Sequence, residues 1–348
     1  MDAGRASADP PDSPPSGSPW RALLSWFDAR AGVTGVPDLD RNRVDWTRIL
    51  PFVGMHAACL AVIWVGASPV AIGVAVAMYL LRMFAITGFY HRYFSHRTFK
   101  TSRPTQFAFA VIGASAVQRG PIWWAAHHRH HHAHSDKADD VHSPTQHGFL
   151  WSHMGWFLSR GHFAPDLGRV RDLLRYPELR WLDRFDILVP VLLALAMLGL
   201  GSFLGHTAPE LGTSGWQMLV WGFFISTVAC YHGTYTINSL CHVWGRRRYA
   251  TGDDSRNNWL LALITLGEGW HNNHHRYPSS ERQGFYWWEI DATHYVLTAL
   301  SWLGLVWDLR TPPSHIYEEA RRLRHRIADS LTLPPRAASP LTEGEGAH

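Results

Sequence analysis

Cysteine is scarce in this sequence. Only three cysteines occur, each in or beside an apolar run and none in a Cys-x-x-Cys pair: Cys59, Cys230 and Cys241. This spacing argues against a disulfide framework, a zinc ribbon and an iron–sulfur cluster held by the chain itself. We expect all three to be small, buried, apolar side chains.

An excess of charge of one sign is also missing. Lys and Arg number 32 against 28 Asp and Glu, the formal net charge is only +4, and the basic residues form no continuous stripe. We therefore expect no nucleic-acid partner, whereas an anionic membrane surface suits a mildly basic chain. Residues 1–19 are rich in Pro and Ser and lack the apolar core of a secretory signal. We expect 1–19 and 334–348 to be disordered tails of a single domain, residues 20–333.

Long apolar runs are abundant, and hydrophobic residues make up 46% of the chain. About 20 apolar residues cross a bilayer as a helix, and four runs approach that length: 49–66, 70–90, 187–205 and 216–235. Short links join them into two hairpins, which places both termini and the segments 91–186 and 236–333 on one side. That side holds nearly all the Lys and Arg and is therefore cytoplasmic. We predict an all-α integral membrane protein with four transmembrane helices and a cytoplasmic helical cap, in a bacterial-type inner membrane.

Three shorter apolar stretches lie within the predicted cap, at 106–116, 148–158 and 295–307. They are too short to span and suit helices that lie on the membrane surface. Residues 316–331 carry alternating acidic and basic side chains and predict an amphipathic cytoplasmic helix.

Histidine is the most informative residue of the chain, which contains 23 of them. Eight fall into three clusters just outside the predicted spans: His91 and His96; His128, His131 and His132; His271, His274 and His275. In the second and third clusters the spacing is i, i+3, i+4, which places three imidazoles on one face of a helix. His91 and His96 would lie about 140° apart on an ideal helix. The first cluster therefore requires the helix to end or unwind between them, near Phe94 and Ser95.

Eight imidazoles are too many for one metal ion, so the clusters predict two ions. Imidazole suits iron, zinc, copper and nickel rather than magnesium or calcium, and a closed zinc site needs only four ligands. A two-metal centre beside acyl chains points to oxygen chemistry on C–H bonds, with iron as the natural metal. The remaining histidines near the second cluster are expected to lie outside the ligand set, either on other helix faces or beside the ligands: His127, His130, His134, His142 and His147. Six others occur singly and predict ordinary structural roles: His56, His153, His162, His206, His232 and His294.

These motifs resemble the three histidine boxes of the membrane fatty-acid desaturases, in particular the stearoyl-CoA Δ9 branch in its bacterial form without a cytochrome b5 domain. The resemblance covers roughly residues 45–310 and rests on three motifs: His91-Arg-Tyr-Phe-Ser-His96, His128-Arg-His-His-His132 followed by Ser135-Asp136, and Gly267-Glu-Gly-Trp-His271-Asn-Asn-His-His275. In that family a further element, Asn-x-x-x-His, ends the fourth span, and Asn238-Ser-Leu-Cys-His242 matches it. The resemblance thus implies His242 as a ninth histidine ligand and Asn238 as a ligand through water.

The resemblance also implies an activity. Such enzymes use two Fe²⁺ ions, O₂ and two electrons to remove two hydrogens from a saturated acyl chain, leaving a cis double bond, typically at carbon 9. The nine histidines would be both metal ligands and catalytic residues. The substrate would be acyl-CoA or acyl-lipid. Acyl-CoA enzymes of the animal branch carry a basic residue two places before the second box, where this chain has Ala126, so an acyl-lipid or acyl-carrier-protein substrate stays open.

The chain has no His-Pro-Gly-Gly haem motif, cysteine cluster or nucleotide-binding fingerprint. Its electrons are therefore expected from a separate partner, a ferredoxin-like or cytochrome b5-like protein or a flavin reductase.

Two other functions compete with desaturation. A membrane diiron hydroxylase or monooxygenase of fatty or alkyl chains uses related histidine boxes, although the Asn-x-x-x-His element together with the third box favours desaturation. A metal transporter would place ionisable ligands inside the bilayer, whereas the predicted spans contain almost no acidic residues.

Overall fold

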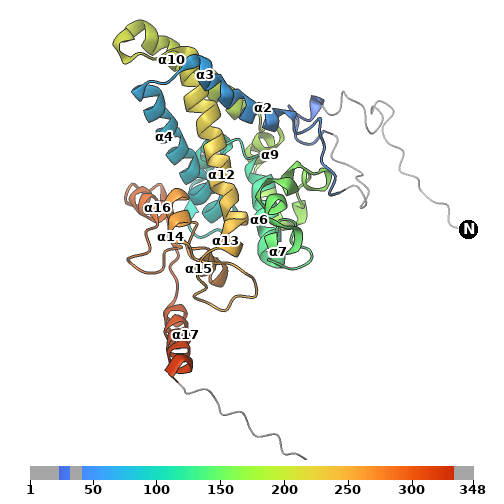
Figure 1. Ribbon diagram of the computed structural model, residues 1–348. Helices are drawn as coiled ribbons and strands as arrows, with labels where there is room; N and C mark the ends of the chain where they lie inside the picture. Colours follow the sequence, from blue (N-terminus) through green and yellow to red (C-terminus); the bar gives the residue numbers. More distant parts are fainter. Residues whose placement is uncertain (1–22, 32–40, 333–348) are drawn as a thin grey trace, which may run out of the picture.

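The computed structural model describes residues 23–31 and 41–332, so the predicted tails, 1–19 and 334–348, lie outside the described residues. Within these ranges the regular structure is almost entirely helical (Figure 1). The exception is one antiparallel pair of short strands, β1 (Lys100–Thr101) and β2 (Val306–Trp307). The helical prediction therefore holds apart from this pair, since strands of two residues leave no pattern that a sequence could reveal.

Four long helical runs match the positions of the four predicted spans. They are α2 (Leu50–Ala58) with η2 (Cys59–Ala61) and α3 (Val62–Val65); α4 (Pro69–Phe84) with η3 (Ala85–Ser95); α10 (Leu188–Thr207); and α11 (Gly215–Met218) with η9 (Leu219–Ile225) and α12 (Ser226–Asn238). Among the described residues, two helices are long and apolar enough to cross a membrane, Pro69–Ser95 with 27 residues and α10 with 20. The first run is apolar but shorter, and the fourth contains buried polar side chains such as Ser226 and Thr227. The four-span topology thus stays a prediction.

The second hairpin packs with its two backbones almost in contact. A Cβ added to Gly201 of α10 would lie 2.4 Å from the carbonyl oxygen of Ser214, and one added to Gly215 would lie 2.3 Å from Ser202 Oγ. Small residues permit this close approach between membrane helices. The link between the helices contains the short η8 (Pro209–Leu211).

Arg82 lies fully buried on α4 and ties this helix to the fourth run. Its guanidinium donates to the carbonyl oxygen of Met78 at 3.0 Å, to that of Gly222 at 3.4 Å, and to the hydroxyls of Ser226 and Thr227. Neutral oxygens therefore satisfy a charge that would be costly to bury alone.

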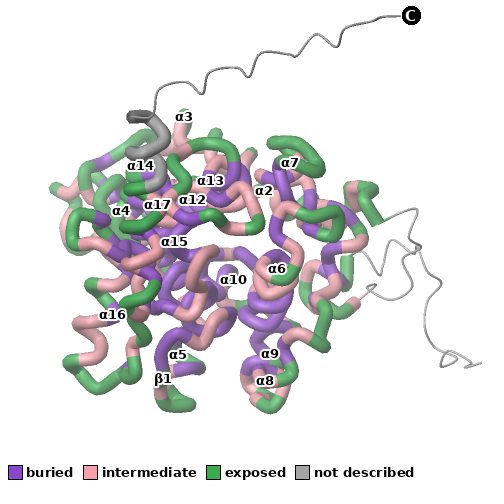
Figure 2. Tube along the Cα trace, turned by 90° about the horizontal axis from the view of Figure 1, so that it is seen from below, coloured by how far each residue is buried: buried purple, intermediate pink, exposed green. Residues whose placement is uncertain are grey.

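The remaining segments form a cap of short helices. Between the hairpins lie α5 (Arg103–Ala114), α6 (Pro121–His134), α7 (Pro144–His147), η4 (Trp151–Gly155), η5 (Trp156–Leu158), η6 (Arg160–His162), η7 (Leu167–Val170), α8 (Arg171–Leu174) and α9 (Pro177–Arg184). After the second hairpin come α13 (Leu240–Val243), α14 (Trp259–Ile264), α15 (His271–Arg276), α16 (Ala292–Trp302) and α17 (Ser314–Thr332). Figure 2 shows buried residues gathered toward the middle of the molecule and exposed or partly exposed ones along α14 and α16 at its margin.

The three apolar stretches expected at the membrane surface all contain short helices. With 12 and 11 residues, α5 and α16 are too short to span a bilayer. Large apolar side chains are exposed on α14 and around α16: Trp259 is 70% exposed, Trp287 84% and Trp302 81%. Exposed tryptophans beside long apolar helices are typical of the zone where a membrane meets water.

Candidate metal centre

The nine predicted histidine ligands come together in two adjacent groups beneath the long helices. The five-histidine group contains His91, His96, His128, His132 and His274, and the four-histidine group contains His131, His242, His271 and His275. Within each group the ring nitrogens all lie within 4.8 Å of one another. Helices α6 and α15 each supply ligands to both groups, so the two groups are held side by side by shared helices.

The first histidine pair is aligned by an unusual helix. Residues Ala85–Ser95 form a π-helix, in which the backbone bonds from residue i to i+5. The amide of His96 accordingly donates to the carbonyl oxygen of His91 at 3.2 Å. The two rings, five residues apart, then lie on one side with their centroids 4.9 Å apart. The sequence required the helix to end or unwind near Phe94 and Ser95; it ends at Ser95, and its last eleven residues form the wider π-helix.

Helix α6 is fixed at its first turn by a carboxylate from α9. Asp183 accepts hydrogen bonds from the backbone amides of Ile122 and Trp123, both at 2.9 Å. These amides have no partner within the helix, and the helix dipole favours a negative charge at this end. Burial nevertheless raises the pKa of Asp183 to about 6. The carboxylate sets the position of the helix that carries His128, His131 and His132.

Four ligand rings are oriented by carboxylates on their Nδ1 atoms. Asp140 lies 2.9 Å from His131, Asp136 lies 2.7 Å from His242, and Asp253 lies 2.7 Å from His275. Glu268 contacts Nδ1 of His91 in the same way. A carboxylate only accepts hydrogen bonds, so each of these Nδ1 atoms carries the hydrogen and each Nε2 presents a lone pair. The same arrangement holds histidines around protein-bound metals.

The Nε2 atoms of the histidine rings crowd together, and most of them face another ring nitrogen. Separations are 2.7 Å for His96 and His128, 2.9 Å for His132 and His274, and 3.1 Å both for His91 with His274 and for His242 with His271. The buried Nε2 of His275 has no hydrogen-bond partner. A metal ion placed among these nitrogens would be held by the lone pair of each deprotonated Nε2. The donor set therefore fits two metal ions of the kind that imidazole binds.

The electrostatics of the two groups favour neutral rings. Burial, followed by the neighbouring rings, holds the pKa values of five ligands well below the ordinary histidine value: His96, His128, His132, His271 and His274. These rings are therefore deprotonated and able to coordinate near neutral pH. The four carboxylates on Nδ1 atoms would offset the four positive charges that two divalent ions introduce.

A buried arginine anchors the carboxylate behind His91. Arg92 donates to Glu268 Oε1 at 3.1 Å and to Asp291 Oδ1 at 2.9 Å, and it also bonds the carbonyl oxygen of Glu281 at 2.9 Å. The other carboxylate oxygen of Glu268 faces His91 and accepts from Gln283 at 2.8 Å. Glu268 is thereby fixed from both sides and positions the His91 ring.

Sequence reasoning did not assign these carboxylates. Asp136 and Glu268 lie within the histidine motifs, where the sequence indicates no role for them, and Asp140 and Asp253 carry no signal beyond being acidic residues. Of the histidines expected beside the ligands, His142 stacks on His131 with ring centroids 4.4 Å apart. On α6, His130 and His134 bond backbone oxygens instead and join neither group.

We expect Asp253→Asn to weaken iron binding at the four-histidine group by about 10–100-fold, as loss of a carboxylate behind a metal-binding histidine usually does. An amide can present its NH₂ group to Nδ1 of His275 and so favours the wrong tautomer. Iron titration of the metal-free protein measures the effect. Asp254→Asn is the matched control, because Asp254 faces Thr145 and Arg247 rather than a ligand. Equal affinities in the two variants would contradict the role given to Asp253.

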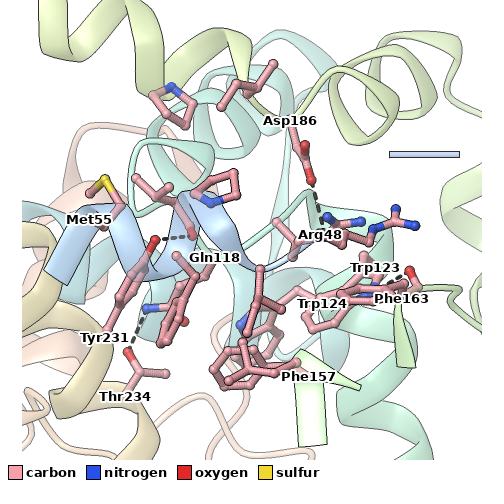
Figure 3. A pocket seen from close by; sticks show the side chains of 18 of the residues that line it. Arg48, Met55, Gln118, Trp123, Trp124, Phe157, Phe163, Asp186, Tyr231 and Thr234 are labelled. Carbon is pink, nitrogen blue, oxygen red and sulfur yellow. Dashed lines mark hydrogen bonds and ion pairs between the residues drawn. The ribbon is translucent and has the colours of Figure 1, made fainter. Parts of the chain in front are cut away.

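A cavity of about 350 Å³ reaches His128 of the five-histidine group. Aromatic and aliphatic side chains of α2, α10, α12 and the cap line it, and His128 and Trp124 lie at its metal end. Figure 3 shows Asp186, Arg48, Trp123 and Phe163 on one side of the cavity and Gln118, Tyr231 and Thr234 on the other, where Gln118 donates to Thr234 at 3.0 Å. Asn238 also lines the cavity. Its role as a ligand through water remains a prediction.

Comparison with known proteins agrees with this geometry. The family model described as "Fatty acid desaturase" matches residues 67–308. The chain is 34% identical to the acyl-CoA 5-desaturase AL21 of Anemone leveillei, over 83% of this chain and 86% of that protein. It is 36% identical to the sn-1 stearoyl-lipid 9-desaturase of Anabaena variabilis, over 78% and 95%. It is 37% identical to the sn-2 palmitoyl-lipid 9-desaturase of Nostoc sp., over 77% and 91%.

Proposed function

This chain belongs to the fatty acid desaturase family and is an oxidoreductase of acyl-CoA or acyl-lipid, and from that premise we propose that it is an O₂-dependent diiron desaturase that introduces a cis double bond at carbon 9 of a saturated acyl chain. The observation that carries the proposal is the convergence of nine histidines in two groups at the end of an apolar cavity. Neither the histidine groups alone nor the apolar cavity alone would distinguish an enzyme that oxidises acyl chains from a metal-binding protein.

Two irons bound by the two histidine groups would supply the chemistry by which O₂ oxidises the acyl chain. The residues of this chain would provide the remaining requirements. His91, His131, His242 and His275 are oriented by carboxylates, which keeps the ligand set in place before metal arrives. Asn238 would complete the four-histidine group through a water molecule. Nine protein ligands on two ions leave room for a small molecule beside them.

The cavity would hold the acyl chain and exclude water. Its walls include Phe52, Phe157, Phe223 and Trp124, which offer a long apolar surface and few polar atoms. Binding along such a surface fixes which pair of methylene groups lies beside His128, and positioning of this kind can supply much of an enzyme's rate enhancement. The cavity thus decides the position of the double bond.

The acyl carrier and the membrane arrangement also belong to the proposal. Ala126 in place of a basic residue leaves both CoA and lipid carriers possible, and the relatives named above include examples of each. We propose that the four helical runs all cross the membrane, with the metal centre and both termini on the cytoplasmic side. A separate ferredoxin-like, cytochrome b5-like or flavin-linked donor would supply the electrons.

Expression in a host that lacks its own desaturase tests the proposal. We expect the host's saturated fatty acids to lose two hydrogens, and mass spectrometry to locate the new double bond at carbon 9. Gain of an oxygen atom would instead identify a hydroxylase or monooxygenase. A double bond at carbon 5 or 7 would still identify a desaturase but would refute the proposed position at carbon 9. Relatives named for those positions exist.

A further inference from the structure

The cavity that reaches His128 lies between two apolar helices, α2 and α10. Phe52 and Met55 of α2 line it, and so does Ala194 of α10. Among the described residues, each of these helices packs on η9, but the two do not pack closely on each other. Figure 3 shows Met55 of α2 and Asp186, which lies shortly before α10, on opposite sides of the cavity. The space between the helices is therefore part of the cavity rather than a packed interface.

Side chains that line the cavity on these two helices also face outward. Val191 is 45% exposed, Pro51 is exposed, and Phe52, Met55 and Ala194 are half-buried. Exposed lining residues on both flanking helices indicate that the cavity opens between them. Helix α10 is also one of the two described helices that are long and apolar enough to cross a membrane. The opening therefore faces the surface where lipid acyl chains are expected.

The charged side chains of the cavity lie at the starts of the two helices. Arg48 precedes α2 and Asp186 precedes α10, and both line the cavity. Asp186 pairs with Arg119 at 3.3 Å. The guanidinium of Arg48 donates to the carbonyl oxygens of Ala29 at 3.0 Å and Ala31 at 3.3 Å. The opening thus has a polar end beside the cap and an apolar wall along the helices.

This polar end offers hydrogen-bond donors that lack an acceptor. Among the described residues that line the cavity, the buried Nε of Arg48 and the buried indole Nε1 of Trp156 have no hydrogen-bond partner. Both side chains can only donate, and an unpaired buried donor is costly. Carbonyl oxygens of a bound molecule would satisfy them. Because Arg119 is already paired with Asp186, these groups suit neutral ester oxygens better than the several phosphate charges of a nucleotide carrier.

We propose that the gap between α2 and α10 is a lateral portal, through which one acyl chain of a membrane lipid enters the cavity directly from the bilayer. The inference rests on the proposed function and names its substrate as an ester-linked acyl lipid rather than acyl-CoA. The ester group stays near Arg48 and Trp156 while the chain extends toward His128. A chain that enters sideways remains in an apolar environment, whereas a chain delivered through water exposes its methylene groups at a cost in free energy.

Photo-crosslinking to the metal-free protein tests the portal without relying on catalysis. The full-length protein is placed in nanodiscs of phosphatidylglycerol that carries a diazirine on its sn-1 stearoyl chain, and mass spectrometry locates the label. We expect labelled residues in the cavity lining. Ala194→Trp fills the gap from α10 and is expected to reduce this labelling by about tenfold or more. Leu195→Trp is the matched control, because Leu195 is 59% exposed on the same helix and lies outside the described cavity lining.

A second pair of variants closes the gap from the other helix, in case Ala194→Trp does not fold. Met55→Trp narrows the gap from α2. Val53→Trp is its control, at a position that is 47% exposed and outside the described cavity lining. We expect Met55→Trp to lower the labelling of the cavity and Val53→Trp to leave it unchanged. Cavity labelling as strong in Ala194→Trp and Met55→Trp as in their controls would overturn the portal.

A comparison of carriers tests the substrate class. In the iron-loaded protein, a deuterated stearoyl chain is supplied either on the lipid of the nanodisc or on CoA in solution. We expect the double bond in the lipid-linked chain. A double bond that forms only in the CoA-linked chain would overturn the choice of lipid and leave the desaturase activity standing. If neither chain is desaturated, the proposed function fails, while the labelling of the metal-free protein still decides whether the portal exists.

Discussion

Replacing His271 by alanine is expected to abolish formation of unsaturated product while the protein still inserts into the membrane. The four-histidine group would keep only His131, His242 and His275. It would also lose the ring whose Nε2 lies 3.1 Å from that of His242. A two-metal reaction needs both ions, so loss of one leaves no partial activity. Product analysis by mass spectrometry and an iron assay of the purified variant measure the effect, and we expect one iron per chain in place of two.

His134→Ala is the control for this experiment. It removes a histidine from α6, next to the second cluster, but Nδ1 of His134 bonds the backbone oxygen of His130 and belongs to neither group. We expect His134→Ala to retain product formation and iron. His128→Ala and His242→Ala should behave like His271→Ala, because each removes a member of one group. Full activity in any of these three variants would remove that residue from the site.

Replacing Arg92 by methionine is expected to destabilise the protein by about 3–5 kcal/mol, the range found when one partner of a buried ion pair is deleted. The three carboxylates around Arg92, those of Glu268, Glu281 and Asp291, are nearly or completely buried. They attract the arginine and raise its pKa despite the opposing effect of burial, while the arginine in turn lowers the pKa of Asp291. Without it, three acidic groups would face one another in the protein interior.

Thermal unfolding of the detergent-solubilised protein measures this loss as a lower midpoint. Arg103→Met is the matched control, because it removes an arginine that pairs with Glu178 at the surface, where such pairs contribute little. Arg92→Lys should fall between the wild type and Arg92→Met, since a lysine keeps the charge but cannot bond Glu268 and Asp291 with the same planar group. An unchanged unfolding midpoint in Arg92→Met would contradict this prediction. It would show that Glu268, Glu281 and Asp291 are neutral once the arginine is removed.

The grouping of the candidate histidine ligands could be predicted from the sequence because most of their spacing follows from helix geometry. The second and third clusters needed only the i, i+3, i+4 rule. The first needed a change in helix type, and the sequence shows that a change is required but not that it is a π-helix from Ala85 to Ser95. His242 was found through its resemblance to a family motif, since a single histidine carries no geometric signal.

The groups that support the ligands could not be predicted in this way. Asp136 contacts His242 from 106 positions away in the sequence, and Asp253 contacts His275 from 22 positions away. Only the folded chain brings such residues together, and no local pattern records the pairing. The fourth predicted span was proposed from its hydrophobic residues, yet its inner face carries Ser226 and Thr227, whose hydroxyls accept hydrogen bonds from Arg82.

The most direct test of the central claim is the number of irons that the full-length protein binds. Purified in detergent, stripped of metal and reloaded with Fe²⁺ without oxygen, the protein should bind two ions per chain, and Mössbauer spectra should show nitrogen-ligated iron in two distinct environments. Binding of a single iron, or of two irons with carboxylate rather than imidazole ligation, would contradict the account.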